Sequence, residues 1–214
     1  MTRKRSIEFR LYLITDRALF PDTTALLRAV EMALRAGVKA VQLREKDLPT
    51  RPLLDLAHRM RELTSRFRAR LFINDRADIA LCTDADGVHL GQSSMPPSAV
   101  RGIVGERMLI GVSTHGVDEL VAAEREGADF VTYGPLYATP SKLRYGAPVG
   151  VGSLKEVIVR TPMPVFGIGG IKKEMIKDVM ASGAHGVALI SGILGVRDIT
   201  SAAEQYLNLV GERV

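Results

Sequence analysis

The sequence VFGIGG, at residues 165–170, is a short apolar run that ends in glycines immediately before an expected helix near Lys172. A second run, GVALISGI at residues 186–193, again leads into an expected helix. Parallel strands that helices bury on both faces typically show such nearly continuous apolar sequence. Each run therefore predicts a strand followed by a helix.

The same unit recurs along the whole chain, which predicts eight strands. They are expected at residues 11–16, 40–45, 70–75, 87–91, 108–114, 129–135, 164–169 and 186–193. Helical periodicity fills most of the intervals, as where Leu26 and Val30 follow Thr23 and Thr24, the expected helix caps. The last helix is expected at residues 199–212.

Alternating units of this kind predict a parallel sheet covered by helices. Closing eight strands into a barrel pairs every strand edge, whereas an open doubly wound sheet, which is the alternative, leaves two edges exposed. We therefore expect a single (β/α)8 TIM-barrel domain over residues 1–214, in which residues 1–10 form a basic N-terminal extension.

Composition narrows the class of protein but names no function. With 46% hydrophobic and 25% charged residues, the chain excludes disordered, collagen-like and disulfide-scaffold proteins. Part of the net charge of +5 lies in residues 3–10, which indicates a solvated tail rather than a surface for nucleic acid or membrane. Cys82, the sole cysteine, is expected to be a buried, inert thiol, and its isolation indicates a reducing, cytoplasmic location. No apolar segment approaches the ~18 residues of a membrane span.

Polar side chains collect where the second and third expected strands end, and in a barrel this face carries the active site. Gln42, Arg44 and Lys46 stand at the end of the second strand, and Asn74 and Asp75 at the end of the third. Strand alternation places Gln42 and Arg44 on the same face, toward either the lumen or the helix layer. Arginine and lysine there could bind a polyanion, because guanidinium pairs bidentately with phosphate; solvated loop cations are the alternative.

Glycines and hydroxyls follow the last two strands, where many barrels bind phosphate. Gly169, Ser191 and Gly192 would offer a phosphate backbone N–H groups and a hydroxyl, although glycines also simply permit tight turns. The long connection at residues 136–152 follows the sixth strand and adds further candidates. These are Thr139, Ser141 and Lys142. A polar surface loop is the alternative for this segment.

Asp75 is a candidate magnesium ligand, because Mg²⁺ typically takes one or two protein carboxylates and completes its shell with water and phosphate oxygens. A helix cap is the alternative for Asp75, and Asp78 competes for that position. The four histidines show no metal-binding spacing, and most are expected to be structural. His115, at the end of the fifth strand, is expected to cap a helix or to support the site.

With these residues identified, the chain resembles the thiamin phosphate synthases over nearly its whole length. The similar stretches, in the family's order, are YLITD (12–16), QLREKD (42–47), INDRAD (73–78), GVHLGQ (87–92), GVSTH (111–115) and GPLYATPSK (134–142). The resemblance implies a transferase of thiamin biosynthesis that condenses hydroxymethylpyrimidine diphosphate with a thiazole phosphate or thiazole carboxylate phosphate. The products would be thiamin phosphate and pyrophosphate, with Mg²⁺ as the cofactor and these small molecules as the partners.

The resemblance also assigns roles to the candidate residues. It implies that the pyrimidine diphosphate is held by Gln42, Arg44, Lys46 and Asn74, with Asp75 on Mg²⁺ and Ser113 beside the reacting pyrimidine. Lys142 would meet the departing pyrophosphate, so that Ser113, Lys142 and Arg44 are the residues expected to carry the catalysis. The thiazole phosphate would be bound by Thr139, Ser141, Gly169, Ser191 and Gly192.

One position departs from the family's pattern. The family usually places a second magnesium-binding aspartate three residues after the glycine that is Gly91 here, and this position is Ser94. Ser94 is therefore expected to complete the metal site through its hydroxyl or a water. The departure leaves two alternatives open: a thiazole tautomerase-like enzyme, and a catalytically silent paralogue that binds a thiazole or thiamin phosphate and regulates a partner. Tautomerases carry a histidine where Pro135 follows Gly134 here. A homo-oligomer is compatible with each reading.

Overall fold

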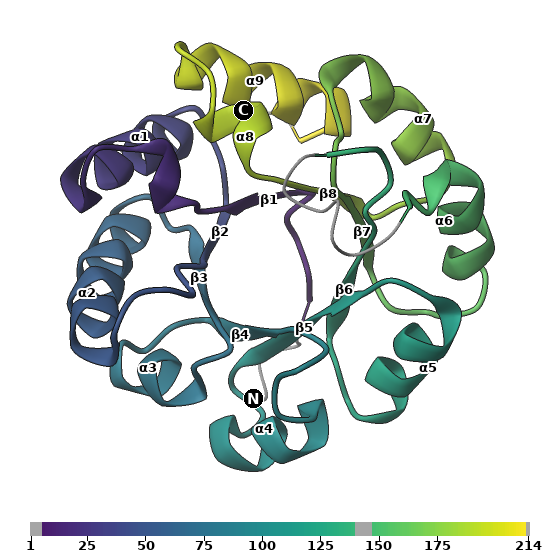
Figure 1. Ribbon diagram of the computed structural model, residues 1–214, viewed down its shortest axis with the longest axis horizontal. Coiled ribbons are helices and arrows are strands. Elements are labelled where there is room, and N and C mark those ends of the chain that lie inside the picture. The colour runs from purple at the N-terminus through teal and green to yellow at the C-terminus, as the bar shows by residue number, and fades with distance from the viewer. Residues whose placement is uncertain (1–5, 140–146, 213–214) are drawn as a thin grey trace.

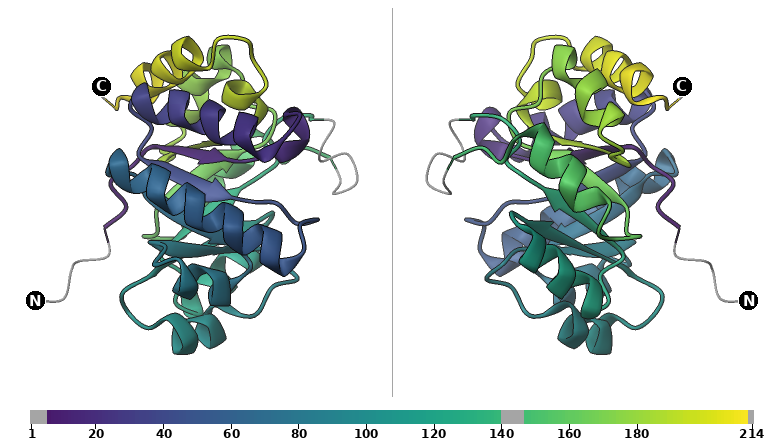
Figure 2. Two further views of the ribbon diagram at one scale, coloured as in Figure 1. Left: turned by 90° about the vertical axis from the view of Figure 1, so that its left-hand side faces the viewer. Right: turned by 90° about the vertical axis from the view of Figure 1, so that its right-hand side faces the viewer.

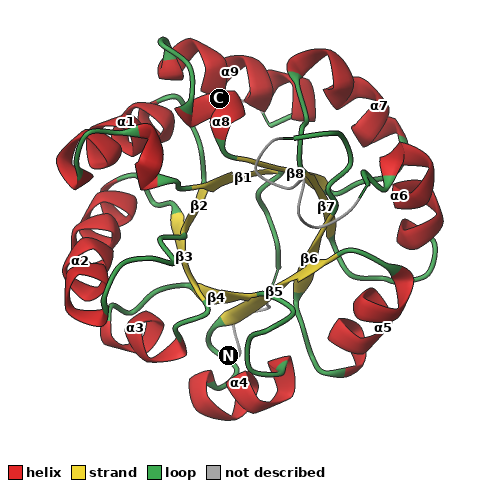
Figure 3. Ribbon diagram, viewed as in Figure 1, coloured by secondary structure: helices red, strands yellow, loops and turns green. Residues whose placement is uncertain are grey.

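The structure is a computed structural model that describes residues 6–139 and 147–212. Over these residues, eight parallel strands close into a barrel in sequence order, and helices surround it (Figures 1 and 3). The strands are β1 Leu11–Ile14, β2 Ala40–Leu43, β3 Arg70–Asn74, β4 Gly87–Leu90, β5 Leu109–Thr114, β6 Phe130–Tyr133, β7 Val165–Ile168 and β8 Gly186–Leu189. The (β/α)8 prediction is confirmed.

The helices between and after the strands form the outer layer. The α-helices are α1 Thr23–Arg35, α2 Thr50–Arg66, α3 Ala77–Cys82, α4 Pro97–Val104, α5 Val117–Arg125, α6 Gly150–Ile158, α7 Ile176–Ala181, α8 Ser191–Leu194 and α9 Ile199–Val210. Two short 3-10 helices are η1 Arg17–Leu19 and η3 Lys173–Met175. No helix within the described ranges is both long enough and apolar enough to cross a bilayer.

The first and last strands close the barrel, which rules out the open sheet. Tyr12 of β1 pairs in register with Ala188 of β8, as does Leu11 with Val187. The strands all point toward one end of the molecule, while the chain enters β1 from the other end (Figure 2). The residues that follow each strand therefore gather at a single face, where a barrel builds its site.

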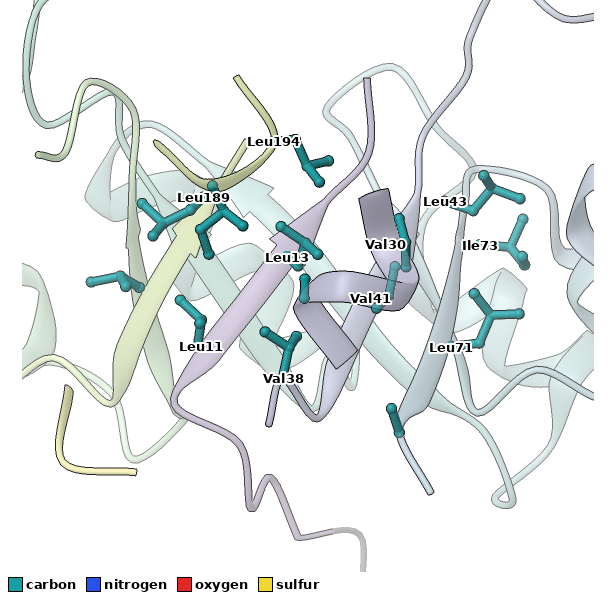
Figure 4. Close-up of a cluster of buried hydrophobic side chains, with 14 of the residues drawn as sticks. Leu11, Leu13, Val30, Val38, Val41, Leu43, Leu71, Ile73, Leu189 and Leu194 are labelled. Atoms are coloured by element: carbon teal, nitrogen blue, oxygen red, sulfur yellow. The ribbon is translucent and has the colours of Figure 1, made fainter. Parts of the chain in front are cut away.

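The outward faces of the strands pack against the helices. Leu11 and Leu13 of β1 belong to a large apolar cluster that also contains Val41 of β2 and Val30 of α1 (Figure 4). Strand alternation sends every second residue to this layer and the others to the lumen. Burial of both faces explains why the strand sequences are apolar almost throughout.

The lumen has an aromatic floor, formed by Phe9, Tyr12, Phe72, Phe130 and Phe166. Phe9 lies just before β1, within the segment expected as an N-terminal extension, and only 2% of it is exposed. Its ring centroid lies 5.2 Å from that of Phe166 and 5.8 Å from that of Phe72. The packed rings fill the lower barrel and leave its C-terminal mouth for polar groups.

Several local expectations differ from the structure. Asp22 caps α1, accepting a hydrogen bond of 2.7 Å from the Ala25 N–H, so Thr23 and Thr24 lie inside the helix rather than before it. Cys82 is exposed, because it ends α3 on the side opposite its buried residues. The last helix ends at Val210, where Gly211 takes the left-handed conformation at φ +77°.

Candidate active site

Polar side chains line the lumen directly above the aromatic floor. Asn74 of β3 lies two residues beyond Phe72 and pairs in register with His89 of β4. Thr132 of β6 lies two residues beyond Phe130 and pairs with Ser113 of β5. Two-residue spacing keeps each polar group on the same face as the aromatic residue below it. We call this set, together with Gln42 of β2, the polar mouth.

Gln42 is the most deeply buried of the predicted ligands in the polar mouth. Its residue exposure is 1%, and its Nε2 amide has no hydrogen-bond partner among the described residues. Leaving such a donor unpaired costs about 1–3 kcal/mol. A fixed, unsatisfied donor in the barrel lumen is therefore well placed to bind an acceptor on a ligand.

The two predicted cations lie just past β2, at the rim of the barrel. Arg44 is half-buried, and its backbone N–H donates to Thr15 Oγ1 over 2.9 Å. Lys46 is more exposed, and its Nζ lies 3.9 Å from Asp75 Oδ2 at the end of β3. The ends of β2 and β3 thus bring a cation and a carboxylate together.

A buried carboxylate that the sequence analysis missed fixes this rim. Glu45 accepts the Thr15 hydroxyl at 2.5 Å through one oxygen and the Arg17 backbone N–H at 3.0 Å through the other. Burial raises the pKa of Glu45, and the two hydrogen bonds partly oppose that rise. Glu45 thereby ties the segment after β1 to the segment that carries Arg44.

Asp75 faces the mouth rather than capping a helix. It takes the left-handed conformation at φ +61°, which aspartate tolerates better than most residues, and α3 begins without a side-chain cap. Its carboxylate accepts hydrogen bonds from Asn74 Nδ2 at 2.7 Å and from the Ser94 hydroxyl. Asp75 and Ser94, the two expected metal ligands, are therefore in direct contact.

A hollow lies between the ends of β7 and β8, with a cavity volume of about 290 Å³. Its lining includes four predicted phosphate ligands, which are Thr139, Gly169, Ser191 and Gly192. Lys172 and Tyr206 also line it, and no sequence motif marked them. We call this hollow the glycine pocket.

Close backbone approach explains the glycines of this pocket. Gly170 has φ +67°, and a Cβ added there would lie 2.7 Å from the Tyr137 carbonyl oxygen. The Tyr137 N–H in turn donates to the Gly169 carbonyl over 3.0 Å. The segment after β6 therefore lies directly on the end of β7, which a larger residue would prevent.

The chain is similar to known proteins over nearly its whole length. The family described as “Thiamine monophosphate synthase” matches residues 11–193. The chain belongs to the thiamine monophosphate synthase family. A “Putative thiamine-phosphate synthase” of Geobacter sulfurreducens is 52% identical, with 97% of each chain covered. The thiamine-phosphate synthase of Clostridium novyi is 42% identical over 95% of this chain and 99% of that protein.

The solved structures agree with the sequence comparison. The structure of a thiamine phosphate pyrophosphorylase from Pyrococcus furiosus superposes with a TM-score of 0.86 at 35% identity, covering 95% of this chain and 96% of that one. This solved structure and the present chain therefore share one barrel fold.

Two of the predicted site residues lie outside the described ranges. Ser141 and Lys142 fall at residues 140–146, so their assignment to the phosphate and pyrophosphate stays a prediction. Thr139, immediately before them, is described and lines the glycine pocket. No cluster of three or more potential metal-binding side chains is found among the described residues.

His115, His185 and His89 contact neighbouring groups, whereas His58 is exposed on α2. The backbone N–H of His115 donates to Glu119 at 2.7 Å, and His115 Nδ1 lies 3.1 Å from the same carboxylate oxygen at the start of α5. His185 Nε2 lies 3.1 Å from the Phe9 carbonyl at the barrel floor, and burial lowers its pKa. His89 lies in the polar mouth, a position that the sequence analysis did not single out.

Proposed function

We propose that this chain is a thiamine-phosphate synthase, a transferase that joins hydroxymethylpyrimidine diphosphate to a thiazole phosphate or thiazole carboxylate phosphate. The proposal rests on family membership and on one structural observation. The polar mouth and the glycine pocket open at the same end of one barrel. A reaction between two phosphorylated molecules needs two such neighbouring sites.

In the proposed reaction, the bond between the pyrimidine's methylene carbon and the diphosphate oxygen breaks, and the electron pair leaves with pyrophosphate. The thiazole nitrogen then gives its lone pair to that carbon and forms the new bond. Where the thiazole carries a carboxylate, the bond from the ring carbon to this group also breaks, CO2 leaves, and the electron pair left on the ring carbon takes a proton from water. The chain must stabilise the departing anion and keep water from the short-lived cation. Cationic side chains would supply the first, and a site that excludes water around the reacting carbon would supply the second.

The pyrimidine diphosphate is assigned to the polar mouth and its rim. Gln42 would donate its unpartnered amide to the substrate, and Arg44 and Lys46 would meet the phosphates. Asn74 already contacts Asp75 and would keep its carboxylate oriented. Ser113 would lie beside the pyrimidine, and Lys142 beside the departing pyrophosphate.

The thiazole phosphate is assigned to the glycine pocket, with Thr139, Ser141, Gly169, Ser191 and Gly192 as its ligands. The pocket supports this assignment because Gly169, Gly192 and the hydroxyl residues Thr139 and Ser191 line one hollow. Lys172 adds a cation at the same hollow. The proposed partners are these two small molecules.

Mg²⁺ fits the donors at Asp75 and Ser94. One carboxylate and one hydroxyl in contact give two of the oxygen ligands that the ion prefers, and waters and substrate phosphates usually complete its shell. When bound, the ion would neutralise charge on the leaving pyrophosphate. Ser94 supplies a neutral oxygen where the family's usual aspartate supplies a charged one, so we expect weaker metal affinity.

The test supplies purified protein with both substrates and Mg²⁺ and measures thiamin phosphate and pyrophosphate. Equal amounts of the two products support the proposal, and no product above an enzyme-free blank rejects it. Consumption of thiazole carboxylate phosphate alone, without metal, would indicate a tautomerase. Ligand-dependent stabilisation against heat without turnover would indicate a silent binding paralogue.

A substitution at Ser94 tests whether this residue is a magnesium ligand. Ser94→Asp adds the missing carboxylate, so we expect it to lower the Mg²⁺ concentration needed for half-maximal activity. Ser93→Asp adds the same charge one residue away and serves as the matched control. An equal response of the two variants would contradict the assignment of Ser94.

A further inference from the structure

Four polar side chains, those of Tyr12, His89, Ser113 and Thr132, form a connected chain of hydrogen bonds in the lumen. The Tyr12 hydroxyl lies 3.4 Å from His89 Nδ1, and His89 Nε2 lies 3.1 Å from Ser113 Oγ. The Thr132 hydroxyl donates to the same Ser113 oxygen over 3.4 Å. Tyr12 is fully buried, His89 is 2% exposed, and Ser113 is half-buried at the mouth.

The direction of these hydrogen bonds follows from Tyr12. Burial raises the pKa of Tyr12 well above its ordinary value, so the phenol keeps its proton. A buried hydroxyl proton requires an acceptor, and among the described residues its hydrogen-bond partner is His89 Nδ1. Nδ1 therefore accepts, and the imidazole proton resides on Nε2.

Ser113 consequently receives two donors. His89 Nε2–H donates to its oxygen from one side, and the Thr132 hydroxyl donates from the other. A serine oxygen has two lone pairs and one proton. With both lone pairs engaged, the proton of Ser113 is left for the open side of the mouth.

Packing holds the imidazole in this position. Gly111 of β5 pairs in register with His89, and a Cβ added to Gly111 would lie 2.6 Å from His89 Nδ1. The imidazole also lies against Phe130, with ring centroids 5.7 Å apart, and against Tyr12 at 5.6 Å. The lack of a side chain at Gly111 makes the space that the imidazole occupies.

We propose that Tyr12 and His89 are positioning residues that make Ser113 a hydrogen-bond donor to the bound substrate. This rests on the proposed function for the identity of the substrate. A donor selects an atom with an available lone pair, which in an aminopyrimidine is a ring nitrogen rather than the exocyclic amino group. The lumen chain thus sets which edge of the pyrimidine faces β5.

The first test reads the imidazole directly and does not depend on activity. ¹⁵N NMR of the ligand-free protein, with His89 assigned by its loss in His89→Gln, reports which ring nitrogen carries the proton. We expect a pyridine-like signal from Nδ1 and a pyrrole-like signal from Nε2. A proton on Nδ1, whether in the other tautomer or in the imidazolium, overturns the proposal.

The second test reads the substrate contact. The probes are hydroxymethylpyrimidine diphosphate and two pyridine analogues, each with one ring nitrogen replaced by carbon, and the measurement is equilibrium binding without the thiazole. We expect Ser113→Ala to weaken binding of the pyrimidine by about 2- to 10-fold and to leave binding of one analogue unchanged. An equal loss for all three probes overturns the proposal.

Two further variants separate positioning from general structural damage. Tyr12→Phe keeps the ring but removes the donor to Nδ1, so we expect a mixture of His89 tautomers and a weaker contact from Ser113. Binding of thiazole phosphate should be unchanged in Tyr12→Phe and Ser113→Ala, because neither residue lines the glycine pocket. A single unchanged tautomer in Tyr12→Phe contradicts the role given to Tyr12. If the chain forms no thiamin phosphate, the proposed function fails while the NMR result still decides the hydrogen-bond direction.

Discussion

Replacing Gly170 with alanine tests whether the glycine pocket depends on close backbone approach. At φ +67°, a Cβ would lie 2.7 Å from the Tyr137 carbonyl oxygen and 2.8 Å from that of Ala138. The left-handed conformation costs a residue with a side chain about 1–2 kcal/mol. Overlap with two backbone oxygens, which cannot rotate away, adds about 1–3 kcal/mol. We therefore expect Gly170→Ala to lower the free energy of unfolding by about 2–5 kcal/mol.

The matched control is Gly127→Ala, at the end of α5. Gly127 also has a positive φ, of +86°, but a Cβ there would meet nothing within 4 Å, so only the backbone cost applies. Urea unfolding of both variants gives the two free energies, and titration with thiazole phosphate gives the affinity. We expect weaker thiazole phosphate binding in Gly170→Ala and unchanged binding in Gly127→Ala. If Gly170→Ala loses no more stability than Gly127→Ala, the packing argument is refuted.

Three other predictions concern the rest of the barrel. Burial raises the pKa of Glu45 and Glu212, so the folded state binds their protons more tightly than the unfolded state and stability falls as pH rises through and above about 4.5. Glu45→Gln removes one of these two carboxyl groups, so the free energy of unfolding, measured in urea between about pH 5 and pH 8, should fall less steeply with pH. An unchanged pH dependence would contradict the role given to Glu45. Asp129→Ala leaves the largely buried Arg101 guanidinium without its 2.6 Å partner and should cost about 3–5 kcal/mol, whereas Arg107→Ala, at an exposed ion pair, should cost less than about 1 kcal/mol. Similar losses in these two variants would count against the buried pair. Exposed Cys82 should react with a thiol reagent in the folded protein, and protection until unfolding would disprove its exposure.

The sequence predicted the barrel because strands buried on both faces appear as continuous apolar runs, whereas helices buried on one face show helical periodicity. The polar residues that ended the expected strands, such as Glu45 and Asp75, lie just past the paired segments, so the observed strands are shorter than expected. Strand alternation also predicted that Gln42 and Arg44 lie on the same face of the second strand. It did not show whether that face is turned to the lumen or to the helix layer. That choice depends on which face of β2 meets the aromatic floor, a property of the closed barrel.

Other features depend on contacts between distant residues. His89 meets Tyr12 across 77 positions of the chain, and no spacing within either segment predicts that pair. Tyr206 reaches the glycine pocket from α9, on a helix that carries no motif. Glu45 lay inside a recognised stretch, yet only the fold shows that its carboxylate binds the segment after β1. Cys82 was expected to be buried because free cysteines usually are, but it is exposed, and the side of α3 on which it lies is set only by the fold.

The assignment of two separate substrate sites is tested most directly by the KM for each substrate in two single variants. Gln42→Leu removes the lumen amide, and we expect it to raise the KM for the pyrimidine diphosphate while leaving the KM for the thiazole phosphate unchanged. Ser191→Ala removes a hydroxyl of the glycine pocket and should have the opposite effect. If each variant raises both KM values equally, or if the two effects are exchanged, the polar mouth and the glycine pocket do not hold the substrates assigned to them.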